Sequence, residues 1–99
     1  MSDGRAARVL IGPLSKPVLP RHVKLRRDAA RDRWTILAPE RVFAPDAIAL
    51  AVLQLCDGAR TTDDIAEQLA HSYTAPKTQI LADVVAMLQD LADKGVVQA

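Results

Sequence analysis

A chain of 99 residues has room for one domain and one small core, and because only 3% of its residues are aromatic, that core is built from Leu, Ile and Val. The net charge of +1 divides unevenly, since residues 1–45 carry ten Lys/Arg and four Asp/Glu whereas residues 46–99 carry three and eight. The basic first half favours an acidic partner, and the acidic second half argues against phosphate contacts there.

The first twenty residues have neither helical nor strand periodicity, and three prolines fall within eight positions. We expect a flexible, Pro-containing tail over residues 1–20 and one folded domain over residues 21–99. The apolar run Val9–Ile11 is too short for a signal-peptide core or a membrane span. The single cysteine cannot form an internal disulfide. These features predict a cytoplasmic protein without membrane contact.

The next stretch has the pattern of a small sheet. His22–Leu25 alternates polar and apolar residues, which predicts a half-buried strand, and Arg26–Arg31 is the expected hairpin turn. Strand-forming residues over Arg33–Ala38 predict a second strand, which Pro39 ends because proline cannot donate to a ladder. Glu40–Ala44 is the expected third strand. Together these segments predict a three-stranded antiparallel sheet.

The remainder of the chain predicts three helices. The first begins at Asp46 and ends at Asp57-Gly58, and the second runs from a Thr61 or Thr62 cap to about Ser72. The third runs from Pro76 to Lys94, with a glycine directly after it as the stop signal. The expected fold is therefore α+β: a winged helix-turn-helix-like arrangement in which three helices follow the sheet.

The third helix has an apolar arc of roughly 160°, which is wider than a surface helix needs. Two sectors make up this arc. They contain, respectively, Ile80, Val84, Met87 and Leu91, and Leu81, Val85, Leu88 and Ala92. Either the first two helices straddle the third and use both sectors, or Leu81, Val85 and Leu88 line a groove beside the third strand.

Nucleic-acid binding and catalysis are both poorly supported. The only cations after Asp46 are Arg60, Lys77 and Lys94, too few for a recognition helix. Cys56 lies on the inward side of the first helix, where cysteine is usually a small apolar residue. No Cys/His cluster has metal-ligand spacing, and no glycine-rich phosphate loop is present.

Three stretches carry a resemblance to a known family: LRRDAARDRWTILAPERV, LQLCDGARTTDDIAEQLA and ILADVVAMLQDLADKGVV. In their order and spacing they resemble PqqD, the small pyrroloquinoline quinone (PQQ) biosynthesis proteins, over about residues 20–97. The most specific pieces are Trp34–Glu40, Leu55–Gly58 and Asp83. The sequence departs from the family before the first helix, where Ala44–Asp46 replaces a Leu-Asn-type start.

The resemblance implies a peptide chaperone without cofactor or catalytic activity. Proteins of this family bind the ribosomal precursor peptide PqqA and present it to PqqE, a radical S-adenosylmethionine enzyme that joins a glutamate to a tyrosine. In related recognition domains the leader peptide adds to the third strand and packs against the third helix.

Combined with the residue pattern, the resemblance predicts a peptide site on the free edge of the third strand. Its apolar contacts lie in a slot on the third helix, and Arg41 and Lys77 receive acidic side chains of the peptide. The expected peptide-binding residues are Arg41, Val42, Phe43, Ala44, Lys77, Leu81, Val84, Val85 and Leu88. The alternative is a homodimerising module that uses the same strand edge and helix sector, so the protein is expected to be a monomer or a homodimer.

Overall fold

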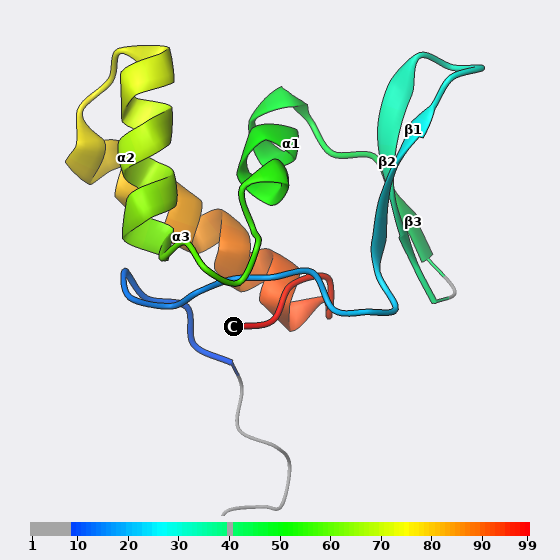
Figure 1. The fold of residues 1–99 in the computed structure, drawn as a ribbon, viewed down its shortest axis with the longest axis horizontal. Coiled ribbons are helices and arrows are strands. Elements are labelled where there is room, and N and C mark those ends of the chain that lie inside the picture. Colours follow the sequence, from blue (N-terminus) through cyan, green and yellow to red (C-terminus); the bar gives the residue numbers. More distant parts are fainter. Residues whose placement is uncertain (1–8, 40) are drawn as a thin grey trace, which may run out of the picture.

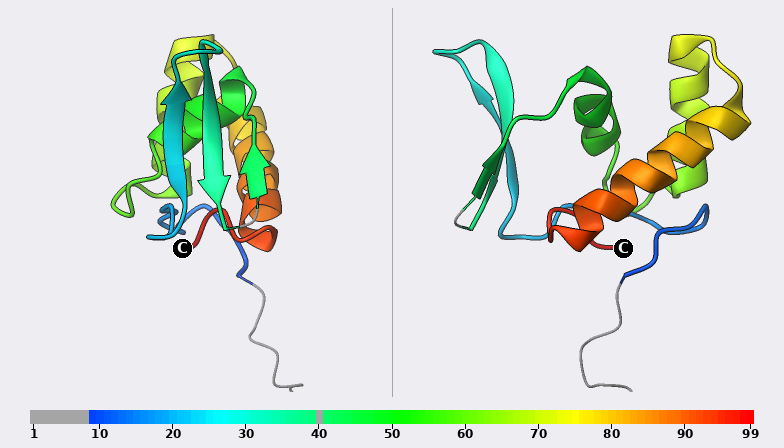
Figure 2. Two further views of the ribbon diagram at one scale, coloured as in Figure 1. Left: turned by 90° about the vertical axis from the view of Figure 1, so that its right-hand side faces the viewer. Right: turned by 180° about the vertical axis from the view of Figure 1, so that it is seen from behind.

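The computed structural model describes residues 9–39 and 41–99, which form three strands followed by three helices (Figure 1). The strands are β1 (Lys24–Asp28), β2 (Arg33–Ala38) and β3 (Arg41–Phe43), and the helices are α1 (Ala47–Gln54), α2 (Thr62–Tyr73) and α3 (Lys77–Asp93). The sheet stands at one end of the molecule, and α2 lies at the other (Figures 1 and 2). The predicted α+β class, with an antiparallel sheet before three helices, is confirmed.

The hairpin between β1 and β2 is longer than the alternation of apolar residues predicts. The predicted hairpin is confirmed, but its predicted turn over Arg26–Arg31 begins too early, because β1 continues to Asp28 and only the residues after it turn. The carboxylate of Asp28 accepts hydrogen bonds from the backbone N–H groups of Ala30 and Arg31, at 3.1 and 3.3 Å. Asp32 has a φ of 51°, which tightens the turn. Local hydrogen bonding by Asp28, rather than apolar periodicity, therefore places the turn.

β3 is a short edge strand, because the order of the sheet is β1-β2-β3. Its pairs with β2 are Arg41 with Ala38, Val42 with Leu37, and Phe43 with Ile36. The predicted third strand was longer: Ala44 lies outside β3, and Glu40 lies outside the described residues. The strand stops early because the chain leaves the sheet after Phe43 to enter α1 (Figure 1).

The two faces of the sheet have different surroundings. Leu25, Ile36 and Phe43 form one cross-strand row, and all three belong to or pack against the core. The next row contains Val42 and Lys24, both exposed. Because successive side chains of a strand point to opposite faces, the first row faces the helices and the second faces outwards.

The helix starts agree with prediction to within one residue, whereas α1 ends at Gln54, before the predicted end at Asp57-Gly58. The Asp46 carboxylate accepts a hydrogen bond from the N–H of Ala49 at 2.8 Å, which caps α1. Thr61 and Asp64 form a reciprocal capping box at the start of α2. Gly95, with a φ of 78°, follows the end of α3 as predicted.

The N-terminal segment, residues 9–20, differs most from expectation. Ile11 is only 7% exposed and belongs to the core. The side-chain amide of Gln89 on α3 forms hydrogen bonds with the backbone of Ile11 and Val9. The amide oxygen accepts from the N–H of Ile11 at 2.9 Å, and the amide nitrogen donates to the carbonyl of Val9 at 2.7 Å. The predicted flexible tail is therefore wrong for residues 9–20, while residues 1–8 lie outside the described residues.

The second half of this segment joins the two ends of the domain. Val18 exchanges backbone hydrogen bonds with Gln98 at 2.8 and 2.9 Å, and the carbonyl of Pro17 accepts from the N–H of Gly58 at 3.0 Å. Pro17 itself is fully buried. No local pattern in the sequence reveals this pairing, because the partners lie 40 or more positions apart.

Candidate functional site

The outer edge of β3 is open. Within residues 9–39 and 41–99, β3 pairs with β2 alone, so its backbone groups on the other side have no strand partner. Val42 is 69% exposed, Arg41 and Ala44 are exposed, and Phe43 is half-buried against the core. An edge strand with unpaired N–H and C=O groups is a template on which another chain can add as a strand.

The predicted slot on α3 is not a free surface as a whole. Leu88 is 0% exposed and Val84 is buried, so both are part of the core. Leu81 and Val85 are half-buried, and Val85 packs against the core cluster. The prediction that Leu88 faces a peptide is therefore wrong.

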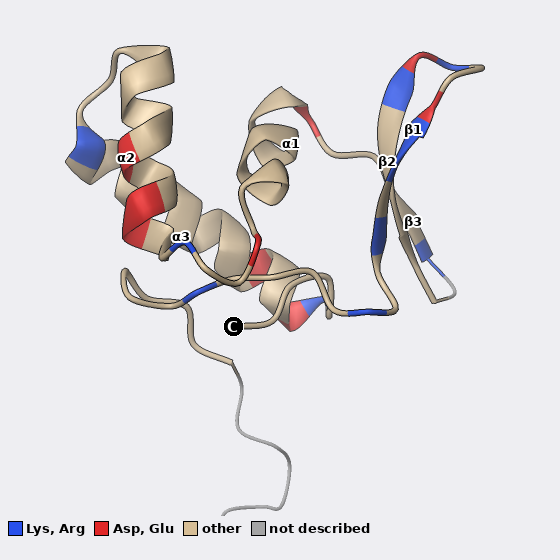
Figure 3. Ribbon diagram, in the orientation of Figure 1, with Lys and Arg blue, Asp and Glu red and all other residues tan. Residues whose placement is uncertain are grey.

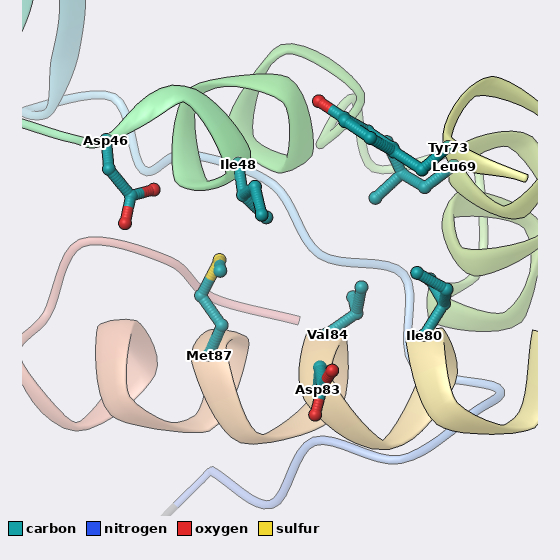
Figure 4. Close-up of a pocket in the computed structure, with 8 residues that line it drawn as sticks. All are labelled: Asp46, Ile48, Leu69, Tyr73, Ile80, Asp83, Val84 and Met87. Atoms are coloured by element: carbon teal, nitrogen blue, oxygen red, sulfur yellow. The ribbon is translucent and has the colours of Figure 1, made fainter. Parts of the chain in front are cut away.

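The N-terminal segment contacts α3 next to the second apolar sector, which neither prediction foresaw. The N-terminal segment passes along α3 at Gln89, which follows directly after Leu88, and inserts Ile11 into the core. In Figure 4 the start of this segment, in faint lavender blue, passes below α3, and its pale blue continuation passes above the helix, behind the pocket. Leu88 of the second sector and Ile11 of this segment thus belong to the same core.

Lys77, predicted to receive acidic side chains of a peptide, already pairs with two carboxylates of α2. Its Nζ lies 2.9 Å from Asp63 and 3.0 Å from Glu67, both on α2. These hydrogen bonds raise the pKa of the Lys77 ammonium above its usual range. Lys77 stands at the start of α3, at the end of the helix far from the sheet (Figures 1 and 3). It joins α3 to α2, so its predicted binding role is not supported.

A pocket of about 280 Å³ lies between α1, α2 and α3 (Figure 4). The residues that line it are Asp46, Ile48, Leu69, Tyr73, Ile80, Asp83, Val84 and Met87. Three of them, Ile80, Val84 and Met87, belong to the first apolar sector of α3. The helix therefore does offer an apolar surface beyond its core contacts, but this surface belongs to the first sector and not to the predicted slot.

Two apolar side chains of this pocket are exposed although they are large. Ile48 on α1 and Tyr73 at the end of α2 are each about half exposed, and both point towards the pocket in Figure 4. The helical spacing of apolar residues predicts that Ile48 and Tyr73 face the interior of the domain. The signal that could have found the pocket is Tyr73, whose phenol suits a position between apolar surface and water.

The rim of the pocket is acidic. Asp46 stands at the start of α1 and Asp83 on α3, and no Lys or Arg is among the lining residues. Figure 3 extends the contrast to the whole domain, because the cations gather on the sheet and the carboxylates on the helices. The sequence predicted this division of charge, and the structure confirms it.

The described residues offer little for catalysis. Burial raises the pKa of the Cys56 thiol to about 12, and its Sγ donates to the carbonyl of Val52 at 3.2 Å, so it is a packed thiol. No group of three or more His, Cys, Asp or Glu in residues 9–39 and 41–99 is placed to hold a metal ion. None of the helices in this part of the chain is long and apolar enough to cross a bilayer.

Comparison with known proteins identifies the family. The model of coenzyme PQQ synthesis protein D (PqqD) matches residues 33–97. The chain belongs to the PqqD family. A PqqA binding protein of Rhodopseudomonas palustris (strain BisB5) is 62% identical over 87 residues, which cover 88% of this chain and 85% of that protein.

A second PqqD relative is part of a longer protein. In the bifunctional coenzyme PQQ synthesis protein C/D of Methylorubrum extorquens, 82 residues are 46% identical, covering 83% of this chain and 22% of that one. The solution NMR structure of the PqqD truncation of Methylobacterium extorquens PqqCD superposes with a TM-score of 0.77 at 43% identity. The match covers 90% of this chain and 95% of that one, which is described as a functional, stand-alone recognition element for ribosomally synthesized and modified peptides.

Proposed function

We propose that this PqqD protein binds the peptide PqqA as an added strand on the open edge of β3 and presents it to the enzyme PqqE in PQQ biosynthesis. The protein acts in the cytoplasm without a cofactor and performs no chemistry itself. The observation that carries the proposal is the free edge of β3, which lies at the start of the connection leading to the apolar pocket.

A peptide can pair with this edge either parallel or antiparallel to β3. Antiparallel pairing continues the pattern of this sheet. Main-chain hydrogen bonds to β3 fix the guest as a strand, and side-chain contacts set its register. Arg41, exposed at the start of β3, is in place to meet an acidic side chain of the peptide. Relatives of 62% identity named for PqqA binding support PqqA as the guest.

The binding step is tested by titrating labelled protein with PqqA peptide and following the amide shifts of Val42, Phe43 and Ala44. The matched control is β1, whose outer edge is also unpaired in the described residues and carries Lys24 and Arg26. Shifts confined to β3 and its neighbours support the proposal. Shifts at β1 alone, or none at either edge, contradict it.

The presentation step needs the enzyme. We expect PqqE to modify PqqA faster when this protein is present, and a protein variant that no longer binds PqqA to give no acceleration. Equal rates with the wild-type protein and without it would refute presentation while leaving peptide binding intact.

The open edge also suits the alternative, a homodimerising module in which β3 pairs with a second copy. Light scattering over a range of protein concentrations, with and without PqqA, separates the two. A dimer that PqqA dissociates is compatible with the peptide site on β3, whereas a dimer that PqqA leaves intact favours the structural module.

A further inference from the structure

We infer that the pocket between α1, α2 and α3 anchors an apolar side chain of the peptide that has a Lys or Arg beside it in sequence. The anchoring residue precedes the segment that pairs with β3. This inference rests on the proposed function, because it concerns how the same peptide is held beyond the strand edge.

The position of the pocket follows from the chain path. Asp46, on the pocket rim, is only three residues beyond Phe43, the last residue of β3, and three residues of extended chain span at most about 11 Å. An antiparallel guest places its earlier residues beside the end of β3. The residues that precede the paired segment therefore reach the pocket within a few positions.

The pocket has the size and surface for a large side chain. Its volume is about 280 Å³, whereas an engineered apolar cavity of roughly 150 Å³ is large enough to bind benzene. Ile48, Tyr73, Ile80 and Met87 supply apolar surface on three helices, and a methionine adapts readily to the shape of a guest. An aromatic side chain, or a leucine together with the stem of a neighbouring lysine, fills this space.

The acidic rim favours a basic residue next to the anchored side chain of the peptide. Asp46 is exposed and uses one carboxylate oxygen to cap α1. Asp83 is also exposed and has no hydrogen-bond or ion-pair partner within the described parts of the chain. In Figure 4 Asp46 lies at one end of the pocket, and Asp83 lies on α3 beside Val84. This rim attracts a cation next to the buried side chain, whereas it repels an acidic neighbour.

Methionine methyl groups provide a direct probe of occupancy. The chain has two methionines, Met1 and Met87, so protein labelled with [13C-methyl]methionine gives two signals. A Met87→Leu variant assigns them. On addition of PqqA peptide, we expect the Met87 methyl to shift and to show contacts with protons of an apolar peptide side chain.

The same sample distinguishes failure of this inference from failure of the proposed function. If the amides of Val42 and Phe43 shift while the Met87 methyl does not, the peptide adds to β3 without entering the pocket, and the inference is wrong. If neither responds, peptide binding to this face fails altogether.

The charge requirement is tested with the single variants Asp46→Asn and Asp83→Asn and with the variant that combines them. Asparagine caps a helix about as well as aspartate, so these changes remove the charge and keep the fold. Each is expected to weaken PqqA binding about 2- to 5-fold at low salt, and the loss should shrink in 0.5 M NaCl. The matched control is Asp90→Asn, an exposed carboxylate on α3 that pairs with Lys94 outside the pocket.

An affinity of the double variant equal to that of Asp90→Asn would overturn the role of the rim. An alanine scan of the peptide gives the complementary result. One apolar residue and an adjacent cation, both before the strand-forming segment, should be the positions whose loss abolishes the Met87 shift. If residues after that segment do so instead, the assigned direction is wrong.

Discussion

Ile11→Ala tests whether the N-terminal segment is part of the folded domain. The change removes three carbon atoms from a side chain that is 7% exposed. At about 0.8 kcal/mol for each buried carbon, the lost transfer free energy is about 2.4 kcal/mol, and a residual cavity adds to it. We therefore expect the free energy of unfolding to fall by about 2.5 to 4 kcal/mol, a large part of the roughly 5–15 kcal/mol typical of a domain.

Urea unfolding followed by the fluorescence of Trp34, the single tryptophan, measures this difference. The matched control is Leu14→Ala in the same segment, because Leu14 is 83% exposed and its truncation should change stability by less than about 0.5 kcal/mol. A loss for Ile11→Ala no larger than that for Leu14→Ala would refute the packed segment and restore the flexible tail.

Three further outcomes follow from individual side chains. Cys56, with a thiol pKa of about 12, should not react with a thiol reagent at pH 8 until the protein is unfolded in denaturant. The pKa of Asp64 is lowered by hydrogen bonds from Thr61, so its contribution to stability should be complete above its ordinary value of 3.8 and disappear as the pH falls below it, which acid unfolding of Asp64→Ala against wild type would test. Lys77→Met should leave PqqA affinity unchanged within about 2-fold, because Lys77 already pairs with α2; calorimetry that gave a 10-fold loss would return Lys77 to the site.

The sequence predicted the helices better than the sheet because their ends carry local signals. Asp46, Thr61 and Gly95 each specify a helix boundary through their own backbone or side-chain chemistry, and each has that role in the structure. The end of β1 was missed because Asp28 sets the turn through hydrogen bonds that apolar alternation does not reveal.

The candidate site was predicted in part for a related reason. Short strands that follow one another in sequence usually pair in that order, which leaves the last strand at an edge. The exposed edge at Val42 could therefore be predicted. The packing of the N-terminal segment against α3 could not, because Ile11 lies 78 positions away from its partner Gln89. Periodicity identifies an apolar face but not the segment that covers it.

The shortness of β3 makes the pocket decisive for affinity. Outward-facing backbone groups alternate along an edge strand, so three residues offer about two to four hydrogen bonds, at roughly 0.5–1.5 kcal/mol net each. Their sum, about 1–6 kcal/mol, barely reaches the roughly 4–15 kcal/mol cost of association. Burial of one large apolar side chain adds about 1.5–3 kcal/mol. In the proposed complex the open edge therefore holds the peptide as a strand, while apolar contacts beside the edge set its register and supply the affinity that so short a strand lacks.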